Sequence, residues 1–473
     1  MDITLNLTSR NGLSLALKQA GIENPKTVTQ LTVAGALTGS DLRYICRNMY
    51  KNLRRIDMSN ASMESEDFNF WGCTGLISIT FPKSVIKFGY CAFCRCSRLT
   101  SINVPASVEE ISSNAFEGCS RLKSITVHPD NQFFASENGV LFDKYRTVLI
   151  KYPEGRQIAS DSFNIPNSVK RIGINAFYGC SRLTSVTIPD SVTRIDNHAF
   201  TGCTGLESII IPNSTTEIGI FAFNGCTGLM SVNIPNSVVE IGYDAFAHCS
   251  GLKSVALPDF ISEIYSSTFF ECHSLTSVTI PESVTKIGSM AFYECSSLRS
   301  VNIPKTVMEI GDSAFSGCCS LTSVDIPDSV TKIKNCAFQD CKSLTSINIP
   351  DSVTEIEYCA FCRCTGLTSV SIPDSVNIIC EGAFDGCTGL TSVTIQIRDL
   401  TVEIYHFDNH EKITDLIRNV ALAYGKYIPY ISSDDESEGK YYYDCDSYYE
   451  DEAMMKMRKL ARVKKITRNK KCI

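Results

Sequence analysis

Apolar and polar positions recur along most of this chain with a fixed period of 23 residues. Each period carries a cysteine, then Leu three residues later, Ser five later, Val or Ile six later and a large apolar residue eight later. The cysteines that mark the period are Cys73, Cys96, Cys119, Cys180, Cys203, Cys226, Cys249, Cys272, Cys295, Cys318, Cys341, Cys364 and Cys387. A fixed period of about 20 to 29 residues predicts a solenoid of stacked coils.

Each period contains one short apolar-alternating segment, L-x-x-[VI]-x-[IVLF], which predicts a strand with one face turned inward and matches the strand of a leucine-rich repeat. A proline such as Pro189 usually follows and ends the strand, because proline has no N–H to donate. An Asp-Ser or Asn-Ser pair then begins a turn. The chain returns through V-x-x-I and Ala-Phe, a path too short for an ordinary helix, so short strands, turns and 3₁₀ pieces are expected there.

The Cys, Leu, Val, Ile, Ala and Phe columns of the repeat are expected to point inward. One coil cannot bury these side chains alone, but its neighbours can. Thirteen of the 23 cysteines belong to the repeat column, and a ladder of buried thiols is the favoured interpretation of them. Disulfides between neighbouring coils stay open as an alternative, because the expected spacing allows them.

Segments such as Ile349–Val376, with the sequence IPDSVTEIEYCAFCRCTGLTSVSIPDSV, are close to the consensus of the BspA-like leucine-rich repeat family. The chain resembles this family from Phe70 to about Ile395, with thirteen copies in register. Familiar members are bacterial and protozoan surface proteins. The resemblance implies a leucine-rich repeat solenoid, a β-rich right-handed coil or horseshoe with a parallel concave sheet. It also implies protein binding, with adhesion to host or matrix proteins as the leading specific role.

The flanking segments are expected to cap the solenoid, which itself spans residues 67–396. Residues 1–66 predict a small α/β cap, with strands near 3–7 and 28–33, helices over 12–20 and from Ser40-Asp41 to about 50, and an early degenerate coil at 53–58. Residues 397–431 predict a closing strand and a short amphipathic helix over 412–424.

Two further segments depart from the repeat. Residues 128–166 interrupt it, and the Asn138-Gly139 turn signal predicts a β-hairpin insertion, either a binding protrusion or a structural elaboration of the coil. Residues 432–473 form an acidic and then a basic tail that is expected to be mobile or weakly helical. The basic part could touch acidic lipid or nucleic acid, pair with the acidic part, or keep the chain soluble.

Charge and hydropathy narrow the function classes. The net charge of −7 argues against a general nucleic-acid binder. The first 30 residues lack a basic start and an uninterrupted apolar run, so no secretory signal peptide is expected. No stretch approaches about 18 consecutive apolar residues, so no transmembrane segment is expected, and the location of the protein is left open.

The expected concave sheet exposes the positions four, five and seven residues after each cysteine, which form a Ser column flanked by Thr and Asn. This face is either an extended binding surface for a protein or a glycan, or simply an exposed sheet that suits Ser and Thr. Glu207, Ile210 and Met230 make its least Ser/Thr-like patch. The candidate binding residues are Thr184, Ser185, Thr187, Glu207, Ser208, Ile210, Met230, Ser231, Asn233, Lys253, Thr276, Ser277, Thr279, Arg299, Asn302, Asp325, Thr345 and Asn348.

Signals for other chemistry are weak. The motif C-x-x-C-x-C occurs at Cys91–Cys96 and at Cys359–Cys364, but each copy has one cysteine in the core column and no evident fourth ligand, so no metal site is expected. Cys336 and Cys359 share a column one coil apart, which would allow a disulfide in an oxidising setting. There is no G-x-S-x-G, Walker or H-E-x-x-H motif, and no cofactor, small-molecule substrate or enzymatic activity is expected.

Three functional hypotheses follow. The first is a non-enzymatic binding or adhesion protein that uses the solenoid surface. The second is an intracellular scaffold or regulator that recruits partners through the concave face or the charged tail. The third, a hydrolase hidden in the cap or the insertion, has little support, because His128 is the only histidine before His198.

Overall fold

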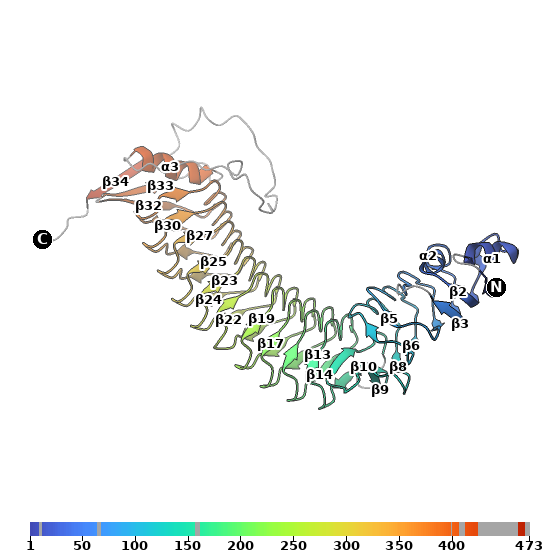
Figure 1. Ribbon diagram of the computed structural model, residues 1–473. Coiled ribbons are helices and arrows are strands. Elements are labelled where there is room, and N and C mark those ends of the chain that lie inside the picture. Colours follow the sequence, from blue (N-terminus) through green and yellow to red (C-terminus); the bar gives the residue numbers. More distant parts are fainter. Residues whose placement is uncertain are drawn as a thin grey trace. The chain divides into compact units, whose positions relative to one another are not determined.

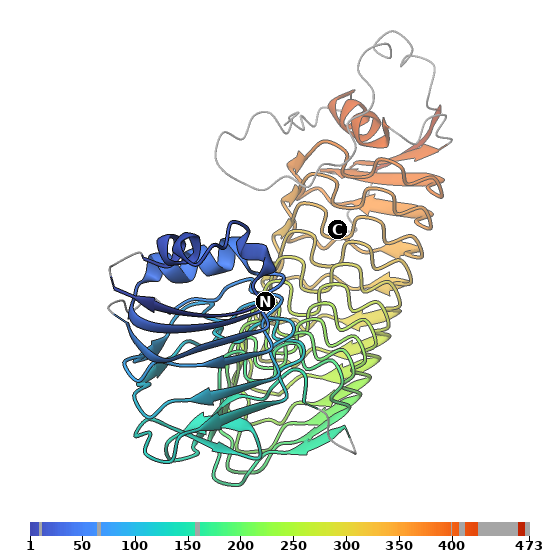
Figure 2. The same ribbon diagram turned by 90° about the vertical axis from the view of Figure 1, so that its right-hand side faces the viewer.

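The computed structural model describes residues 1–8, 12–63, 68–156, 161–398, 400–405, 412–423 and 462–468. It comprises two compact units, Met1–Phe246 and Ala247–Ile473, each of which is described by itself. In both units short parallel strands stack coil upon coil, as the 23-residue period predicts (Figure 1, Figure 2).

The N-terminal cap is a parallel sheet with two helices beside it. Its elements are β1 (Asp2–Leu7), α1 (Leu13–Gln19), η1 (Pro25–Thr27), β2 (Gln30–Leu37), α2 (Gly39–Asn48) and β3 (Arg55–Met63), followed by β4 (Ser78–Thr80) of the first full coil. Strand β3 pairs with β4 in a register of one period, Arg55 opposite Ser78, which confirms the early degenerate coil.

Helix α2 begins differently from the sequence-based expectation. The N-cap is Thr38, and Asp41 is the third helical residue of a capping box. The buried Asp41 carboxylate also accepts a hydrogen bond of 3.1 Å from the backbone N–H of Leu13. Asp41 therefore ties the start of α1 to the start of α2, which explains why a charged residue is buried here.

The coils of the first unit contribute strands to two kinds of parallel sheet. We call the strands that start at the repeat serine the front sheet and the two-residue strands on the way back the return sheet. The front strands are β6 (Ser101–Val104), β8 (Ser124–Val127), β12 (Ser162–Asn164), β14 (Ser185–Thr187), β16 (Ser208–Ile210) and β18 (Ser231–Asn233). The return strands are β5 (Lys87–Phe88), β7 (Glu110–Ile111), β13 (Arg171–Ile172), β15 (Arg194–Ile195), β17 (Glu217–Ile218) and β19 (Glu240–Ile241).

The second unit continues with the same two kinds of strand. Its front strands are β20 (Ser254–Ala256), β22 (Ser277–Thr279), β24 (Ser300–Asn302), β26 (Ser323–Val324), β28 (Ser346–Ile347) and β30 (Ser369–Ile372). Its return strands are β21 (Glu263–Ile264), β23 (Lys286–Ile287), β25 (Glu309–Ile310), β27 (Lys332–Ile333), β29 (Glu355–Ile356) and β31 (Ile378–Ile379). Paired residues in both units lie one period apart, for example Ser277 opposite Ser300.

The C-terminal end of the second unit closes as the sequence predicts. Strand β32 (Ser392–Ile397) turns back into β33 (Leu400–Tyr405) as an antiparallel pair, and α3 (Ile413–Ala423) buries Ile413 and Ile417 (Figure 1). Strand β34 (Arg462–Arg468) pairs antiparallel with β33, which differs from the mobile or weakly helical tail that was expected there. The acidic part of the tail lies outside the described residues.

The core of each unit is a stack of phenylalanine rings. Phe200 lies 4.7 Å from Phe177 and 5.1 Å from Phe223, measured between ring centroids, with the rings nearly parallel. These side chains are fully buried, which confirms the inward Phe column. Since neighbouring coils supply both faces of each ring, no single coil is stable alone.

The thirteen register cysteines are buried thiols, as the ladder interpretation predicts. A recurring contact explains the choice of cysteine. The thiol of Cys203 donates to the carbonyl oxygen of Phe177 in the preceding coil at 3.1 Å, and Cys364 does the same to Phe338 at 3.1 Å. Burial raises the pKa of Cys119 to about 12 and that of Cys364 well above its ordinary value, so these thiols stay protonated.

The insertion contains the expected hairpin and, in addition, a hidden coil. Strands β9 (Phe134–Glu137) and β10 (Val140–Asp143) pair antiparallel around Asn138-Gly139, where both residues have positive φ. Strand β11 (Val148–Lys151) then pairs with β10 and runs parallel to β13 in the return sheet. Ser162 of β12 lies opposite Ser185, one period later. The insertion therefore supplies a complete coil that lacks the cysteine.

This hidden coil contains a buried ion pair. Lys151 stands where other coils have Ala, and its Nζ lies 3.7 Å from Oε1 of Glu154, with both side chains almost fully buried. Lys151 also donates to the carbonyl oxygens of Asn175 and Tyr178, and Glu154 accepts from the backbone N–H of Gly118 at 2.9 Å. The pair thus connects the coil before the insertion to the coil after it.

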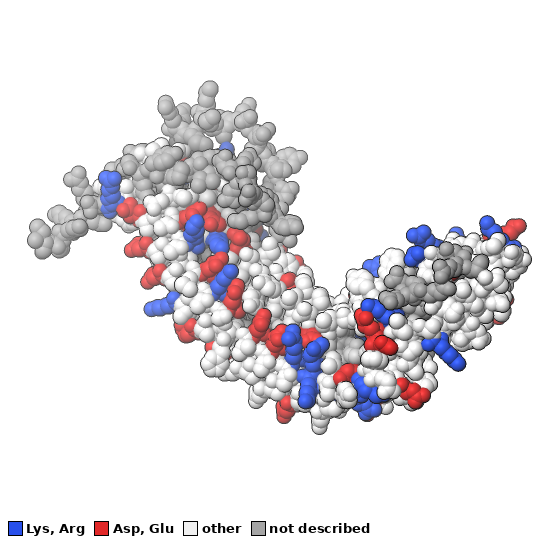
Figure 3. All heavy atoms as spheres, in the orientation of Figure 1, with Lys and Arg blue, Asp and Glu red and all other residues white. Residues whose placement is uncertain are grey.

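The return strands hold rows of charged side chains, which alternate in sign in the second unit, whereas in the first unit Arg171 pairs with Arg194 and Glu217 with Glu240. In the first unit, Arg194 contacts Glu217 at 2.9 Å, and in the second, Lys286 lies 3.6 Å from both Glu263 and Glu309. Acidic and basic side chains are interspersed over the described residues in the face shown in Figure 3. Such exposed pairs contribute little stability each, about 0–1 kcal/mol, but in the second unit opposite charges on paired strands favour the observed register.

Candidate functional site

The candidate site is the outer surface of the front sheet, which we call the Ser/Thr face. It consists of the residues four, five and seven positions after each register cysteine. Every candidate residue named from the sequence is exposed except Thr184, which is half-buried. The strand period of two places positions five and seven outward on either side of the buried Val or Ile at position six, whereas position four immediately precedes the strand.

One of the three columns has a structural role that the sequence did not reveal. The Thr184 hydroxyl donates to the carbonyl oxygen of Asp161 at 3.0 Å, Thr276 donates to Lys253 at 3.0 Å, and Thr345 donates to Thr322 at 3.4 Å. These threonines connect successive coils through their side chains. The hydroxyls at this position are therefore partly occupied, and the columns five and seven residues after the cysteine are better placed for a partner.

In the first unit the face carries an apolar patch. Ile210 is 72 % exposed and Met230 is 44 % exposed, although both lie on a sheet surface of Ser, Thr and Asn. Ile210 lies between Thr187 and Asn233 in the strand register, and Glu207 is exposed beside it. The structure thus places Glu207, Ile210 and Met230 on adjacent coils of one surface, as the sequence pattern predicted.

The face of the second unit has a different character. Its exposed departures from Ser and Thr are polar or charged, namely Lys253, Arg299, Asn302, Asp325 and Asn348. Asp325 and Asn348 form an isolated parallel bridge, which keeps them in the same column. Among the described residues of this part of the face, no large apolar side chain is exposed. The apolar patch therefore distinguishes the first unit.

Sequence reasoning missed a second group on the return side of the first unit. Ile174, Ile220 and Tyr243 are exposed six residues before their register cysteines, in a column that also contains Asn197. Next to them the His198 ring stacks on Phe221 with 4.8 Å between centroids. Burial lowers the pKa of His198, so the ring is neutral where it packs. The sequence did contain a signal for this group, because its residues are apolar or aromatic in a column that is mostly polar in the other coils.

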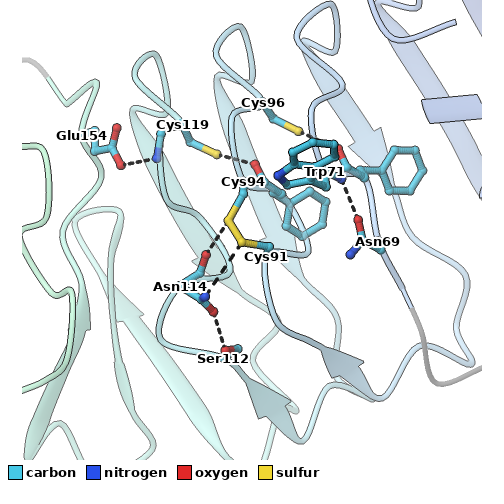
Figure 4. The surroundings of a disulfide bond; sticks show 12 residues. Asn69, Trp71, Cys91, Cys94, Cys96, Ser112, Asn114, Cys119 and Glu154 are labelled. Atoms are coloured by element: carbon cyan, nitrogen blue, oxygen red, sulfur yellow. Dashed lines mark hydrogen bonds between the residues drawn. A yellow bond between two sulfur atoms is a disulfide. The ribbon is translucent and has the colours of Figure 1, made fainter. Parts of the chain in front are cut away.

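The first C-x-x-C-x-C motif holds a disulfide. Cys91 and Cys94 are bonded, with their Cα atoms 4.7 Å apart, and Asn114 of the next coil lies beside both sulfur atoms (Figure 4). Cys96 belongs to the buried thiol ladder and donates to Phe70. Within the described parts of the chain, no group of His, Cys, Asp and Glu side chains is arranged to hold a metal ion.

The disulfide between Cys336 and Cys359 stays a prediction, because the structure holds both as half-buried thiols. As to membranes, none of the helices in the described ranges combines the length and the apolar character that a bilayer crossing requires.

Comparisons with solved structures give other leucine-rich repeat proteins. A leucine-rich repeat protein from Bacteroides ovatus is 30 % identical, with 66 % of this chain and 78 % of that chain covered and a TM-score of 0.47. A leucine rich cell surface protein from Faecalibacterium prausnitzii is 26 % identical, with 78 % and 88 % covered and a TM-score of 0.42. A leucine-rich repeat protein from Eubacterium ventriosum is 21 % identical, with 77 % and 84 % covered and a TM-score of 0.43.

A search of curated proteins gave no match. The family model of the BspA type leucine rich repeat region matches repeatedly, at residues 39–138, 156–269, 194–318, 221–345 and 309–422. Together these segments cover well over half of the chain, and they coincide with the coils described above. The chain therefore belongs to the BspA-type leucine-rich repeat family.

Proposed function

We propose that this protein is a non-enzymatic adhesion protein that binds host or matrix proteins through the Ser/Thr face of its first unit. The observation that carries the proposal is Ile210, a β-branched apolar side chain that is 72 % exposed at the centre of a polar sheet. Proteins of this family are generally protein-binding or surface proteins and typically lack catalytic activity. The family thus supports protein binding as the class of function, and the apolar patch supports the Ser/Thr face of the first unit as the binding surface.

Protein-binding surfaces have a characteristic composition. A few apolar anchors surrounded by small polar groups supply most of the free energy of a typical protein interface. Ile210 and Met230 would be such anchors, and Ser208, Ser231 and Asn233 would surround them. Burying one exposed Ile side chain contributes about 1.5–3 kcal/mol. The flat sheet holds the anchors rigidly, so little conformational entropy is lost on binding.

The substitution Ile210→Thr tests this assignment. Thr is the residue at the same position of the preceding coil, Thr187, so the fold should be kept. We expect Ile210→Thr to weaken binding to the tightest partner in a panel of immobilised fibronectin, laminin and collagen by about tenfold or more, which corresponds to about 1.4 kcal/mol. Surface plasmon resonance measures the dissociation constants.

The matched control is Val239→Thr. Val239 is a 60 % exposed β-branched residue on the return side of the same unit, and Thr216 occupies its position in the preceding coil. Binding by this variant should equal that of the wild type. If Val239→Thr weakens binding and Ile210→Thr does not, the partner site lies on the return side. If the wild type binds no member of the panel, the proposed adhesion to matrix proteins is wrong.

One observation bears on the alternative, an intracellular scaffold that recruits partners through its basic tail. Strand β34 pairs with β33, so deletion of residues 432–473 would uncover the edge of β33 and confuse the test. The substitutions Lys470→Glu and Lys471→Glu change the charge of the basic tail at positions outside β34. Partner binding that these two changes abolish, and that Ile210→Thr leaves intact, would favour the scaffold over the adhesion protein.

A further inference from the structure

The chain contains the same six residues, CAFCRC, at Cys91–Cys96 in the first unit and at Cys359–Cys364 in the second. A tyrosine precedes both copies. In the first copy Cys91 and Cys94 form a disulfide. In the second, the structure holds Cys359 and Cys362 as half-buried thiols.

The two copies have the same backbone geometry. Cys91 and Cys359 both adopt the left-handed conformation, with φ of 54° and 53°, and so do Arg95 and Arg363, with φ of 61° and 58°. The N–H of Cys94 donates to the carbonyl oxygen of Cys91 at 3.1 Å, and Cys362 donates to Cys359 at 3.0 Å. A disulfide requires specific Cα–Cα and Cβ–Cβ separations, and these depend on the backbone. The second turn therefore shares the φ values and the backbone hydrogen bond of the first.

The next hydrogen bonds along the two copies also agree. Phe93 and Phe361 each donate to an alanine carbonyl of the following coil at 2.8 Å. The third cysteine of each copy, Cys96 or Cys364, donates its thiol to a buried phenylalanine carbonyl at 3.2 or 3.1 Å. The third cysteine is thus held in the ladder in both copies.

We propose that Cys359 and Cys362 are a second disulfide site, the counterpart of Cys91–Cys94, and that the buried ladder thiols from Cys96 to Cys387 stay reduced. The oxidant is a low-molecular-weight disulfide such as oxidised glutathione. A thiolate of the pair attacks the glutathione disulfide, breaks its S–S bond and releases one glutathione as the thiol. The second cysteine then attacks the mixed disulfide and releases the other glutathione. The pair loses two electrons, and its two protons are carried by the two released thiols.

The protection of these ladder thiols follows from burial. They have almost no exposed surface, and Cys96 and Cys364 donate to core carbonyl oxygens, whereas Cys359 and Cys362 are half-buried. Cys73 is the exception in the ladder, because its sulfur lies 2.9 Å from that of the half-buried Cys46. Thiol–disulfide exchange requires an accessible thiolate. Burial raises the pKa of the ladder thiols, which lowers their thiolate fraction further.

The residues one coil away from the two turns differ, and they indicate which other disulfide could form in the second turn. Asn114 follows the first turn one coil later, whereas Gly382 follows the second, and the Cys359 sulfur faces Gly382 closely enough that a Cβ there would lie 3.0 Å away. One coil earlier, Cys336 stands in the column of Cys359, also with positive φ. A Cys336–Cys359 bond is therefore the alternative that the test must separate from Cys359–Cys362.

Peptide mapping of the full chain separates them. The protein is reduced, equilibrated with mixtures of reduced and oxidised glutathione, denatured in N-ethylmaleimide to label every thiol, and digested with trypsin. Cleavage at Lys and Arg leaves Cys91 and Cys94 in the peptide 88–95, Cys359 and Cys362 in the peptide 343–363, and Cys336 in the peptide 335–342. The first peptide is an internal standard for the second.

We expect that, after oxidation, neither cysteine of peptide 88–95 and neither of peptide 343–363 carries the label. Each peptide should then be two hydrogen atoms lighter than its unlabelled dithiol form. The two peptides should reach this state at glutathione ratios within about tenfold of each other. The ladder cysteines from Cys96 to Cys387 should stay labelled throughout, and Cys336→Ser should change nothing. Three results would overturn the proposal: two labels on 343–363 where 88–95 is fully oxidised, a cross-link between 335–342 and 343–363, or failure of 88–95 to oxidise even in oxidised glutathione alone.

Discussion

Replacing Phe200 with alanine is expected to destabilise the first unit by about 3–5 kcal/mol, the usual cost of removing a fully buried aromatic ring from a core. The ring is stacked between Phe177 and Phe223, so its removal leaves a cavity that both neighbours border. Because each coil is stabilised by the coils on either side, the defect should lower the stability of the stack and not of one coil alone.

The single tryptophan, Trp71, lies in the same unit and reports its unfolding in urea. The matched control is Tyr145→Ala, because Tyr145 is 83 % exposed in the insertion of that unit. Its effect should stay within about 0.5 kcal/mol. Equal destabilisation by Phe200→Ala and Tyr145→Ala would show that the stacked rings are not the core that holds the coils together.

The substitution Lys151→Ala is expected to cost a similar amount, about 3–5 kcal/mol at neutral pH, because it leaves the Glu154 carboxylate buried without its cation. Alanine is the ordinary residue of this column, as in Ala176 and Ala199, so the smaller side chain itself fits. The loss should come from the uncompensated charge. The double substitution Lys151→Ala with Glu154→Gln removes that charge and should restore most of the stability.

The loss of stability caused by Lys151→Ala should depend on pH. Burial raises the pKa of Glu154 above its ordinary value, while Lys151 and the Gly118 N–H oppose the shift. Without Lys151 the folded pKa should rise further. The folded state then binds the proton more tightly than the unfolded state, so stability falls as pH rises from the unfolded to the folded pKa. The defect should therefore be smallest below about pH 4.5 and absent from the double variant. A defect that does not change with pH would contradict the buried-charge explanation.

Much of the fold could be predicted from the sequence because its information is repeated. The Leu, Cys and Phe columns each have thirteen members, so the inward-facing positions could be identified even where one coil was irregular. The hidden coil of the insertion escaped because it lacks the cysteine and has Lys151 in the alanine column. Only the structure brings Glu154 and the carbonyl oxygens of Asn175 and Tyr178 to that lysine.

The candidate site was predictable in outline, and its details were not. Strand alternation alone placed Ile210 outward, next to the buried Ile209, whereas Met230 precedes strand β18 and its exposure follows from its otherwise polar column. The sequence did not show that hydroxyls such as Thr345 would bond to the preceding coil, because this depends on the spacing between stacked strands. It also gave no sign of the Cys91–Cys94 bond, because that bond depends on a left-handed residue in the turn, and several residue types occupy that position in other coils.

The most direct test of the Ser/Thr face as the binding surface is hydroxyl-radical footprinting of methionines, with and without the tightest partner from the matrix panel. Met230 is exposed on the face, and Met308 is 61 % exposed on the return side of the second unit, so each is open to oxidation in the unbound protein. We predict that the bound partner slows oxidation of Met230 several-fold and leaves Met308 unchanged. Protection of Met308 alone, or an unchanged Met230 in a saturated complex, would contradict the account.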